Sequence, residues 1–269
     1  LDVNLEQKDE WSQTLQDGDV LRVYSILEKM ENIVQLEGEV LRPGASQWFE
    51  GMRLSDLIRG ERDLIEGADD QYLIVKHEAR EGRKIEVVSS NLRSVLMNPQ
   101  SVENVKLYPR DQVTVLSTKA DRMGHLNRLT RQLRSEARFG EAENVVNIVG
   151  NVRFPGGYPY VKGMRIKDLL NSSLGILPRT DMNYSLIRRV NGINRHVEVH
   201  AVSLSKIVAN ESENLLLRPE DELIILSLDE NRAARISKLA SDMKRQETPE
   251  VPAKLVSIEG NILKPGVYP

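Results

Sequence analysis

The chain has four histidines and no cysteine, so a metal site would have to rest on imidazole and carboxylate ligands. His196 and His200 are four residues apart, a spacing that brings two imidazoles to one metal ion when the segment is a helix. Their segment alternates polar and apolar residues, however, and this pattern predicts a strand, on which the two rings would lie roughly 13 Å apart. One ion cannot contact both rings at that distance, so we expect no metal site.

Several aspartates recur along the chain, but their positions indicate turns and not acid–base chemistry. Asp19, Asp111 and Asp221 each belong to a short repeated motif, and Asp side chains commonly bond to nearby backbone groups in turns. Asp69 and Asp70 lie in a turn-like stretch, where we expect them to be solvated. The sequence has no glycine-rich phosphate loop, nucleophile elbow or kinase signature. We therefore expect no enzymatic activity and no cofactor.

Arginine and aromatic side chains near a repeated Pro-Gly turn are the candidates for ligand binding. An aromatic ring can stack on a sugar ring, and a guanidinium can pair with the acidic groups of a glycan. The aromatic residues could instead pack in a core or between repeats. Burial of Trp48, Tyr158 and Tyr160 would favour that structural role, and exposure on one continuous face would favour binding. The candidate ligand-binding residues are Arg42, Trp48, Arg53, Arg153, Tyr158, Tyr160 and Arg165.

The overall charge of the chain argues against one class of partners. A net charge of −3 and a pI of about 5.9 are unlike those of nucleic-acid-binding proteins, which usually carry a basic excess. Residues 119–138 differ from the rest, because they contain six basic and two acidic residues. A helix with this charge could guide an anionic polymer or contact an acidic partner surface.

Three short motifs recur in the same order and at nearly constant spacing, which indicates an internal repeat. The first is GEVLRPG at 38–44, with counterparts GNVRFPG at 150–156 and GNILKPG at 260–266. The second is GMRLSDLI at 51–58 and GMRIKDLL at 163–170. The third is NVKLYPRDQV at 104–113 and NLLLRPEDEL at 214–223, with a related LQDGDVL at 15–21. The chain therefore holds the end of one repeat, two complete repeats and the start of another.

Each complete repeat predicts a small α+β domain with the element order β-β-α-β-β-(α)-β. Period-2 alternation predicts strands, and apolar residues at i, i+3 and i+4 predict a short helix after the Gly-Met-Arg segment. A mixed sheet packed on one helix, a β-grasp, fits this order. Charged segments with an apolar helical stripe join the repeats. The predicted domains are a repeat tail at 1–28, a first β-grasp domain at 29–117, a helical linker at 118–143, a second β-grasp domain at 144–228, a helical linker at 229–253 and the start of a further repeat at 254–269.

The motifs between residues 15 and 58 together resemble soluble-ligand-binding β-grasp (SLBB) domains. Their tandem arrangement is similar to that of the outer-membrane polysaccharide export proteins of Gram-negative bacteria, and this resemblance covers nearly the whole chain. Relatives also occur among cobalamin-binding proteins and quinone-linked electron-transfer complexes. Against that third interpretation, the sequence offers no cofactor ligand beyond isolated histidines. We expect the chain to be an internal part of a longer protein.

The resemblance implies a periplasmic, outer-membrane-associated role in the secretion of a capsule or exopolysaccharide. The repeats would contact the polysaccharide weakly and many times, as part of a conduit that a homo-oligomer of the full-length protein assembles. An inner-membrane polysaccharide co-polymerase would be a further partner. The alternative is a purely structural module that supports oligomerisation or binds another protein and has no contact with sugar.

Overall fold

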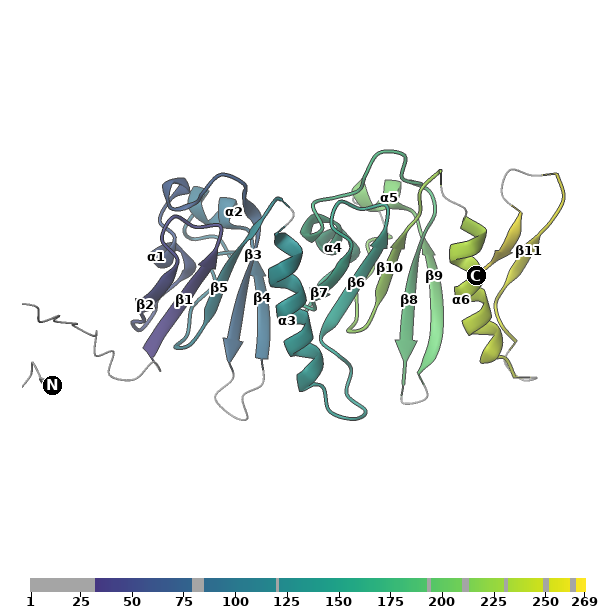
Figure 1. The fold of residues 1–269 in the computed structure, drawn as a ribbon, viewed down its shortest axis with the longest axis horizontal. Helices are drawn as coiled ribbons and strands as arrows, with labels where there is room; N and C mark the ends of the chain where they lie inside the picture. Colours follow the sequence, from purple (N-terminus) through teal and green to yellow (C-terminus); the bar gives the residue numbers. More distant parts are fainter. Residues whose placement is uncertain are drawn as a thin grey trace, which may run out of the picture. The chain divides into compact units, whose positions relative to one another are not determined.

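Two five-stranded sheets with the same strand order make up most of the fold (Figure 1). The computed structural model describes residues 32–78, 85–119, 121–192, 195–209, 213–229, 232–248, 252–261 and 265–269. The repeat tail predicted at 1–28 lies outside these residues. We call residues 33–117 the first repeat and residues 145–225 the second repeat.

The first repeat is a mixed sheet with two short helices and a 3-10 helix. Its strand order is β2-β1-β5-β3-β4, in which β1 pairs in parallel with β5 and the other neighbours are antiparallel. This order fits a β-grasp and confirms the predicted α+β fold class. The elements are β1 Ile33–Gly38, β2 Gly44–Gln47, α1 Leu54–Leu57, η3 Glu61–Asp63, β3 Ala68–Glu78, β4 Ile85–Ser90, α2 Leu92–Met97 and β5 Gln112–Ser117.

The second repeat has the same architecture. Its strand order is β7-β6-β10-β8-β9, and its parallel pair is β6 with β10. The strand predicted around His196 and His200 is present as β9. The elements are β6 Val145–Gly150, β7 Gly156–Pro159, α4 Ile166–Ser172, β8 Ser185–Asn191, β9 His196–Val202, α5 Leu204–Val208 and β10 Glu222–Ile225.

The first glycine of the repeated Gly-x-x-x-x-Pro-Gly motif is required by the approach of two parallel strands. Gly38 has a φ of +90°, and a Cβ on this residue would lie 2.0 Å from the carbonyl oxygen of Val115. Gly150 has a φ of +96°, and its Cβ would lie 1.9 Å from the carbonyl oxygen of Ile225. A residue with a side chain would collide with the neighbouring backbone in both repeats, which explains the motif without a ligand.

The second and third motifs meet at the start of the first helix in each repeat. The guanidinium of Arg53 donates to the carbonyl oxygen of Asn104 at 2.7 Å, and that of Arg165 donates to Asn214 at 2.8 Å. The backbone N–H of Arg53 also donates to the side chain of Asp56 at 2.8 Å, which satisfies a free donor at the helix start. These contacts tie segments about fifty residues apart and explain why the two motifs recur together.

The two faces of the first sheet are covered by different parts of the chain. Leu54 and Ile58 at α1 and Leu92 and Val95 in α2 lie in the core cluster on one face. Tyr72, Ile74 and Leu116 belong to a second cluster, which also contains the buried core of the second repeat. Alternate residues of a strand point to opposite faces, so β3 contributes to both clusters.

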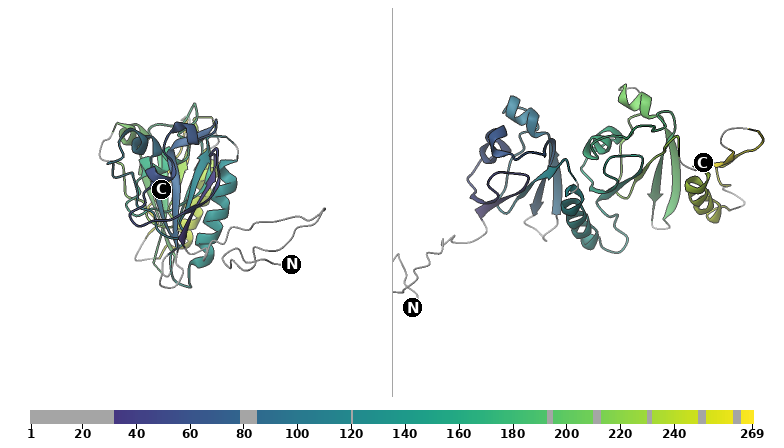
Figure 2. Two further views of the ribbon diagram at one scale, coloured as in Figure 1. Left: turned by 90° about the vertical axis from the view of Figure 1, so that its left-hand side faces the viewer. Right: turned by 45° about the horizontal axis from the view of Figure 1, so that its top comes forward.

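Helix α3 (Arg122–Glu136) completes that second cluster and follows the first repeat directly. Leu126 and Leu133 are buried, and Met123 and Leu129 pack against the cluster, as the predicted apolar stripe requires. Figures 1 and 2 show α3 between the first sheet and the β6–β7 hairpin. One continuous apolar core therefore joins the two repeats.

Helix α6 (Arg232–Arg245) has the same place after the second repeat. Its residues Ile236 and Leu239 form a smaller cluster with Leu186, Ile224 and Leu226 of the second sheet, and Tyr268 packs on it. A two-stranded sheet of β11 (Val256–Ile258) and β12 (Gly266–Tyr268) follows. No helix in the described ranges combines the length and apolar character needed to cross a bilayer.

Candidate functional site

One buried guanidinium connects the two repeats. Arg122, at the start of α3, is fully buried. Its Nη1 donates to Oδ2 of Asp69 at 2.7 Å and to the carbonyl oxygen of Ser117 at 3.1 Å, and its Nη2 donates to the carbonyl oxygen of Ser172. Asp69 and Ser117 belong to the first sheet, and Ser172 ends α4 of the second repeat. We call this contact the Arg122 clamp.

Aromatic rings surround the Arg122 clamp. The guanidinium carbon of Arg122 lies 5.5 Å from the ring centre of Tyr72 and 5.9 Å from that of Phe154, within cation–π range. Tyr158 is fully buried, and its hydroxyl donates to the carbonyl oxygen of Phe154 at 2.8 Å. Burial raises the pKa of Tyr158 to about 12 and raises the pKa of Tyr72 further. Both phenols therefore stay neutral at physiological pH.

A cleft opens at the surface beside the clamp and has one wall from each repeat. Its volume is about 340 Å³, which lies at the lower end of the range of small-molecule sites, roughly 300–1,000 Å³. We call it the junction cleft. Its walls are mainly polar, with amide, carboxylate, ammonium and hydroxyl groups. The polar residues that line it include Gln71, Ser89, Asn91 and Glu103 of the first repeat and Lys162, Asp168 and Asn171 of the second.

The polar groups of the junction cleft divide into positioned and free ones. Oε2 of Glu103 accepts from the backbone N–H of Asn91 at 2.7 Å, and Oδ2 of Asp168 accepts from a backbone N–H at 2.8 Å, so both carboxylates are held in place. Gln71, Lys162 and Asn171 are exposed. Within the described ranges their side chains make no hydrogen bond to the protein. They are available to a ligand with hydroxyl or carboxylate groups.

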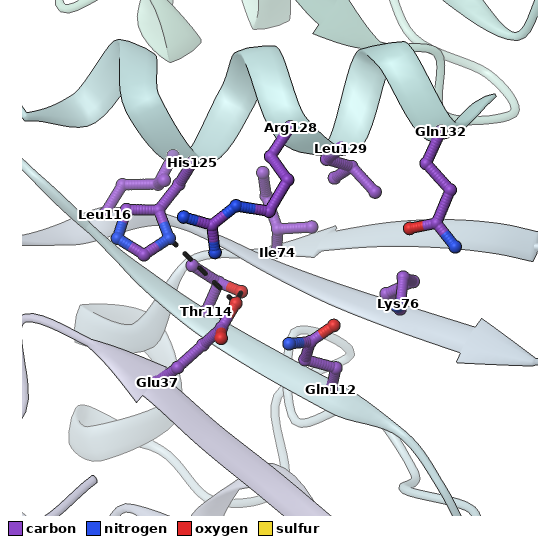
Figure 3. Close-up of a pocket in the computed structure, with 10 residues that line it drawn as sticks. All are labelled: Glu37, Ile74, Lys76, Gln112, Thr114, Leu116, His125, Arg128, Leu129 and Gln132. Atoms are coloured by element: carbon purple, nitrogen blue, oxygen red, sulfur yellow. Dashed lines mark hydrogen bonds and ion pairs between the residues drawn. The ribbon is translucent and has the colours of Figure 1, made fainter. Parts of the chain in front are cut away.

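A second, smaller pocket lies under α3 (Figure 3). The hydroxyl of Thr114 donates to Oε1 of Glu37 at 2.9 Å, and Nδ1 of His125 lies 4.0 Å from the same oxygen. Arg128 and Gln132 reach over it from α3. Its volume of about 50 Å³ suits a few water molecules and is far below that of ligand sites, roughly 300–1,000 Å³. The junction cleft is therefore the better candidate for ligand binding.

A comparison with protein families bears on the second repeat. Residues 145–194 match the model of the SLBB domain. The matched segment spans β6, β7, α4 and β8, and it supplies the second wall of the junction cleft. No curated protein sequence matches the chain. The match supports a protein that contains an SLBB domain, and the strand order of the first repeat is the same as that of the SLBB-matching repeat.

The aromatic candidates for sugar stacking serve mainly in packing. The ring of Tyr158 has no exposed surface and cannot stack on a ligand in this arrangement, which corrects the expected role of this residue. The indole N–H of Trp48 donates to the carbonyl oxygen of Leu107 at 2.8 Å, and its half-buried ring packs on the first core. Tyr160 is half-buried against the cluster shared by the two repeats. Hydrophobic burial explains these positions, because large aromatic rings gain most when they cover the apolar cores of the repeats.

The arginine candidates divide into two pairs. Arg53 and Arg165 have exposed side chains, but each guanidinium already bonds to a carbonyl of its own repeat. Arg42 and Arg153 are exposed in the Pro-Gly turns. None of the four lines the junction cleft, so the structure does not bring the predicted candidates together there.

The main error of the sequence-based interpretation was the predicted exposure of Asp69. This residue was expected to be solvated, yet it is 2% exposed and holds Arg122. The sequence did contain a signal: Arg122 recurs as Arg232 and Asp69 recurs as Asp181, at the offsets of the repeat. A charged residue that recurs in a linker with an equivalent partner indicates an ion pair that each repeat needs.

The histidines lie apart from the junction cleft. His196 and His200 are both on β9, and Nε2 of His200 lies 3.6 Å from Oε2 of Glu198. Nδ1 of His77 lies 2.7 Å from Oδ2 of Asp111, in the closing turn of the first repeat. In the part of the chain that the structure describes, no three His, Asp or Glu side chains are grouped to hold a metal ion.

Proposed function

We propose that this protein is a non-catalytic module of a polysaccharide export protein, in which tandem SLBB domains contact the exported glycan and help to build the export conduit. The family match at residues 145–194 supports the assignment of the second repeat. The equal strand order and the shared motifs support the assignment of the first. Together they favour a tandem array over a single binding domain.

The junction cleft is the observation that carries this proposal. Sugars present hydroxyl groups that donate and accept hydrogen bonds, and the free side chains of Gln71, Lys162 and Asn171 offer both functions. The two walls belong to different repeats, and the Arg122 clamp fixes their separation. The cleft therefore exists only where two repeats follow each other, which ties glycan contact to the repeated architecture.

The setting of this module follows from the resemblance of its motifs. In our proposal the full-length protein lies in the periplasm of a Gram-negative bacterium as part of an outer-membrane-associated homo-oligomer. An inner-membrane polysaccharide co-polymerase supplies the glycan. An open, polar cleft gives weak contact, and weak contacts repeated along an array suit transport, because a tight site would hold a moving polymer.

An NMR titration of the protein with neutral and acidic oligosaccharides tests the proposal. We expect saturable shifts at the walls of the junction cleft, and we expect the double variant Gln71→Ala/Asn171→Ala to weaken them. Gln100→Ala is the matched control, because Gln100 is an exposed amide that does not line the cleft. Equal weakening by the control, or no shifts at millimolar sugar, would contradict glycan binding in the cleft.

A purely structural module is the second candidate function. The burial of Tyr158 and the Arg122 clamp favour it, because both use large side chains to hold the two repeats together and neither leaves these side chains free for a ligand. Under this alternative the array would support oligomerisation or bind another protein without contact to sugar. Sedimentation of the full-length protein would then show an oligomer for the wild type and its loss for Arg122→Met. The oligosaccharide titration would show no chemical-shift changes.

A further inference from the structure

The two linker helices hold a disproportionate share of the basic residues. Helices α3 and α6 contain nine of the 37 Lys and Arg residues of the chain but only two of its 40 Asp and Glu residues. The rest of the chain therefore carries 28 basic and 38 acidic residues. Positive charge is therefore concentrated on the two helices, whereas the rest of the chain taken together has an acidic excess, a difference that net charge alone conceals.

The basic side chains lie on the exposed sides of the helices. In α3, Arg128 and Arg131 are exposed. At 3.6 residues per turn Arg131 lies opposite the buried Leu126 and Leu133, whereas Arg128 reaches from the edge of the helix over the pocket that Glu37 lines. Within the described ranges neither arginine has an ion-pair partner. The exposed surface of α3 thus carries two guanidinium groups, Arg131 on its outer side and Arg128 at the edge over the pocket.

Helix α6 repeats this arrangement with different residues. Lys238 and Arg245 are exposed and lie opposite the buried Ile236 and Leu239. Lys238 is 110 residues after Arg128, the offset that also separates Arg122 from Arg232. The guanidinium of Arg245 lies 3.8 Å from the carboxylate of Asp242. One basic position, Arg128 in α3 and Lys238 in α6, therefore recurs, whereas the second basic residue occupies a different position on each helix.

We propose that the exposed basic sides of α3 and α6 form a periodic surface that binds an acidic polysaccharide. This proposal rests on the proposed function and deepens it, because it assigns carboxylate-bearing glycans to the linkers and leaves the junction cleft to hydroxyl groups. A long polyanion can contact both helices at once, so two weak sites act together. In the right-hand view of Figure 2 both helices lie at the edge away from α1, α2, α4 and α5.

The burial of the apolar helix sides favours a soluble polymer over a membrane surface. Amphipathic helices that bind membranes insert an apolar side into the lipid. Leu126 and Leu133 of α3 and Ile236 and Leu239 of α6 are already covered by the sheets. The charged sides of the helices are therefore the sides available to a partner. A surface that binds by charge and inserts no apolar residues suits an extended anionic polymer in solution.

Charge reversal on the helices tests the proposal, with polygalacturonate oligomers as the acidic probe and dextran oligomers as the neutral one. We expect Arg128→Glu/Arg131→Glu and Lys238→Glu/Arg245→Glu each to weaken polygalacturonate binding by roughly fivefold or more. We expect the combination to abolish it and 0.5 M salt to weaken it in the wild type, because exposed charges are screened. The control Arg62→Glu/Lys106→Glu makes the same change in net charge at exposed residues of the first repeat.

The outcomes separate this proposal from the proposed function. Equal weakening by the control, unchanged binding by both helix variants, or equal binding of dextran at the helices would overturn the basic surface. The cleft variant Gln71→Ala/Asn171→Ala should leave the helix shifts intact. If the helix shifts are absent and the cleft shifts remain, only this inference fails; if no saccharide binds anywhere, both fail. Stronger binding to vesicles of phosphatidylglycerol than to polygalacturonate would show that the basic surface binds a membrane and not a polysaccharide.

Discussion

Helices α3 and α6 follow equivalent sheets and hold an equivalent arginine, yet they cover different surfaces. Arg122 pairs with Asp69, and Arg232 pairs with Asp181; both pairs are almost entirely removed from solvent. An aromatic residue of the next hairpin accompanies each pair, with Tyr158 in the first junction and Tyr268 in the second. The ion pair and the ring are thus the constant part of the junction.

The surface beneath the two helices is the variable part. Under α3, Glu37 and Thr114 form a polar pocket with His125. The equivalent sheet residues under α6 are Val149 and Ile224, which join an apolar cluster. Loss of one member of a buried ion pair strongly destabilises the fold, because it leaves the other charge buried without a partner. Replacement of a partly hydrated polar pocket by apolar side chains changes the stability much less. The repeat therefore keeps the clamp and lets the rest of the contact change.

The closing turns of the two repeats differ in a related way. In the first, the imidazole of His77 faces Asp111 at 2.7 Å. In the second, Arg189 occupies the same place and donates to both carboxylate oxygens of Asp221, at 2.9 and 2.7 Å. A guanidinium is charged at every physiological pH and forms two parallel bonds, whereas an imidazole is charged only when it is protonated. The second closing turn therefore holds its aspartate independently of pH.

Removal of the clamp should have the largest effect. Arg122→Met leaves the buried carboxylate of Asp69 without its counter-charge, and we expect a loss of about 3–5 kcal/mol in the free energy of unfolding, measured in urea. The equivalent Arg232→Met should lose less, because Arg232 and Asp181 are less completely buried than Arg122 and Asp69. Arg131→Met, on the exposed side of α3, is the control and should change stability by less than about 0.5 kcal/mol. The double variant Arg122→Met/Asp69→Asn should recover much of the loss; if it is no more stable than Arg122→Met, burial of the charge is not the cause.

Exchange of the closing-turn partners should have the next largest effect. Arg189→His gives the second repeat the pair of the first, and at pH 8, where an ordinary histidine is neutral, we expect a loss of about 1–3 kcal/mol. Lowering the pH to 5 should restore part of it by protonating the new imidazole. The reciprocal His77→Arg should leave stability at pH 8 unchanged or higher. A loss for Arg189→His that does not depend on pH would show that packing, and not charge, distinguishes the two turns.

High pH should destabilise the first junction. Burial raises the pKa of Tyr158 to about 12, above the ordinary tyrosine value of about 10, so the folded state disfavours its phenolate. This stability is complete below pH 10 and falls as the pH rises toward 12; we expect a loss of about 1 kcal/mol at pH 11 from Tyr158 alone. Urea unfolding between pH 9 and 11 measures it. Tyr158→Phe should show a shallower dependence, and an equal slope in that variant would rule out this phenol as the source.

Filling the polar pocket should have the smallest effect. Glu37→Val/Thr114→Ile copies the sheet residues of the second junction, and we expect stability to stay the same or rise by up to about 1 kcal/mol. Thermal unfolding, followed by circular dichroism, would detect the change. A clear loss of stability would show that the pocket under α3 is specific to the first junction and is not a tolerated variation of the second.

Much of the fold could be read from local patterns in the sequence. The positions of the strands, the helix stripe of α3 and the alternation of polar and apolar residues depend on neighbours within a few residues. The glycine motif also determined a close approach of strands, since no other residue fits at Gly38 or Gly150. The recurrence of these patterns at a fixed offset predicted two similar domains.

Only the tertiary structure decided which side chains meet at the junction. Asp69 lies 53 residues before Arg122 and Ser172 lies 50 residues after it, and the three meet because α3 packs between the first sheet and the β6–β7 hairpin. The same packing buried Tyr158, which the sequence had offered as a candidate for ligand binding or for packing, and created the junction cleft from two separate repeats. Burial and cleft shape depend on surfaces brought together over long range, and no local pattern of residues carries that information.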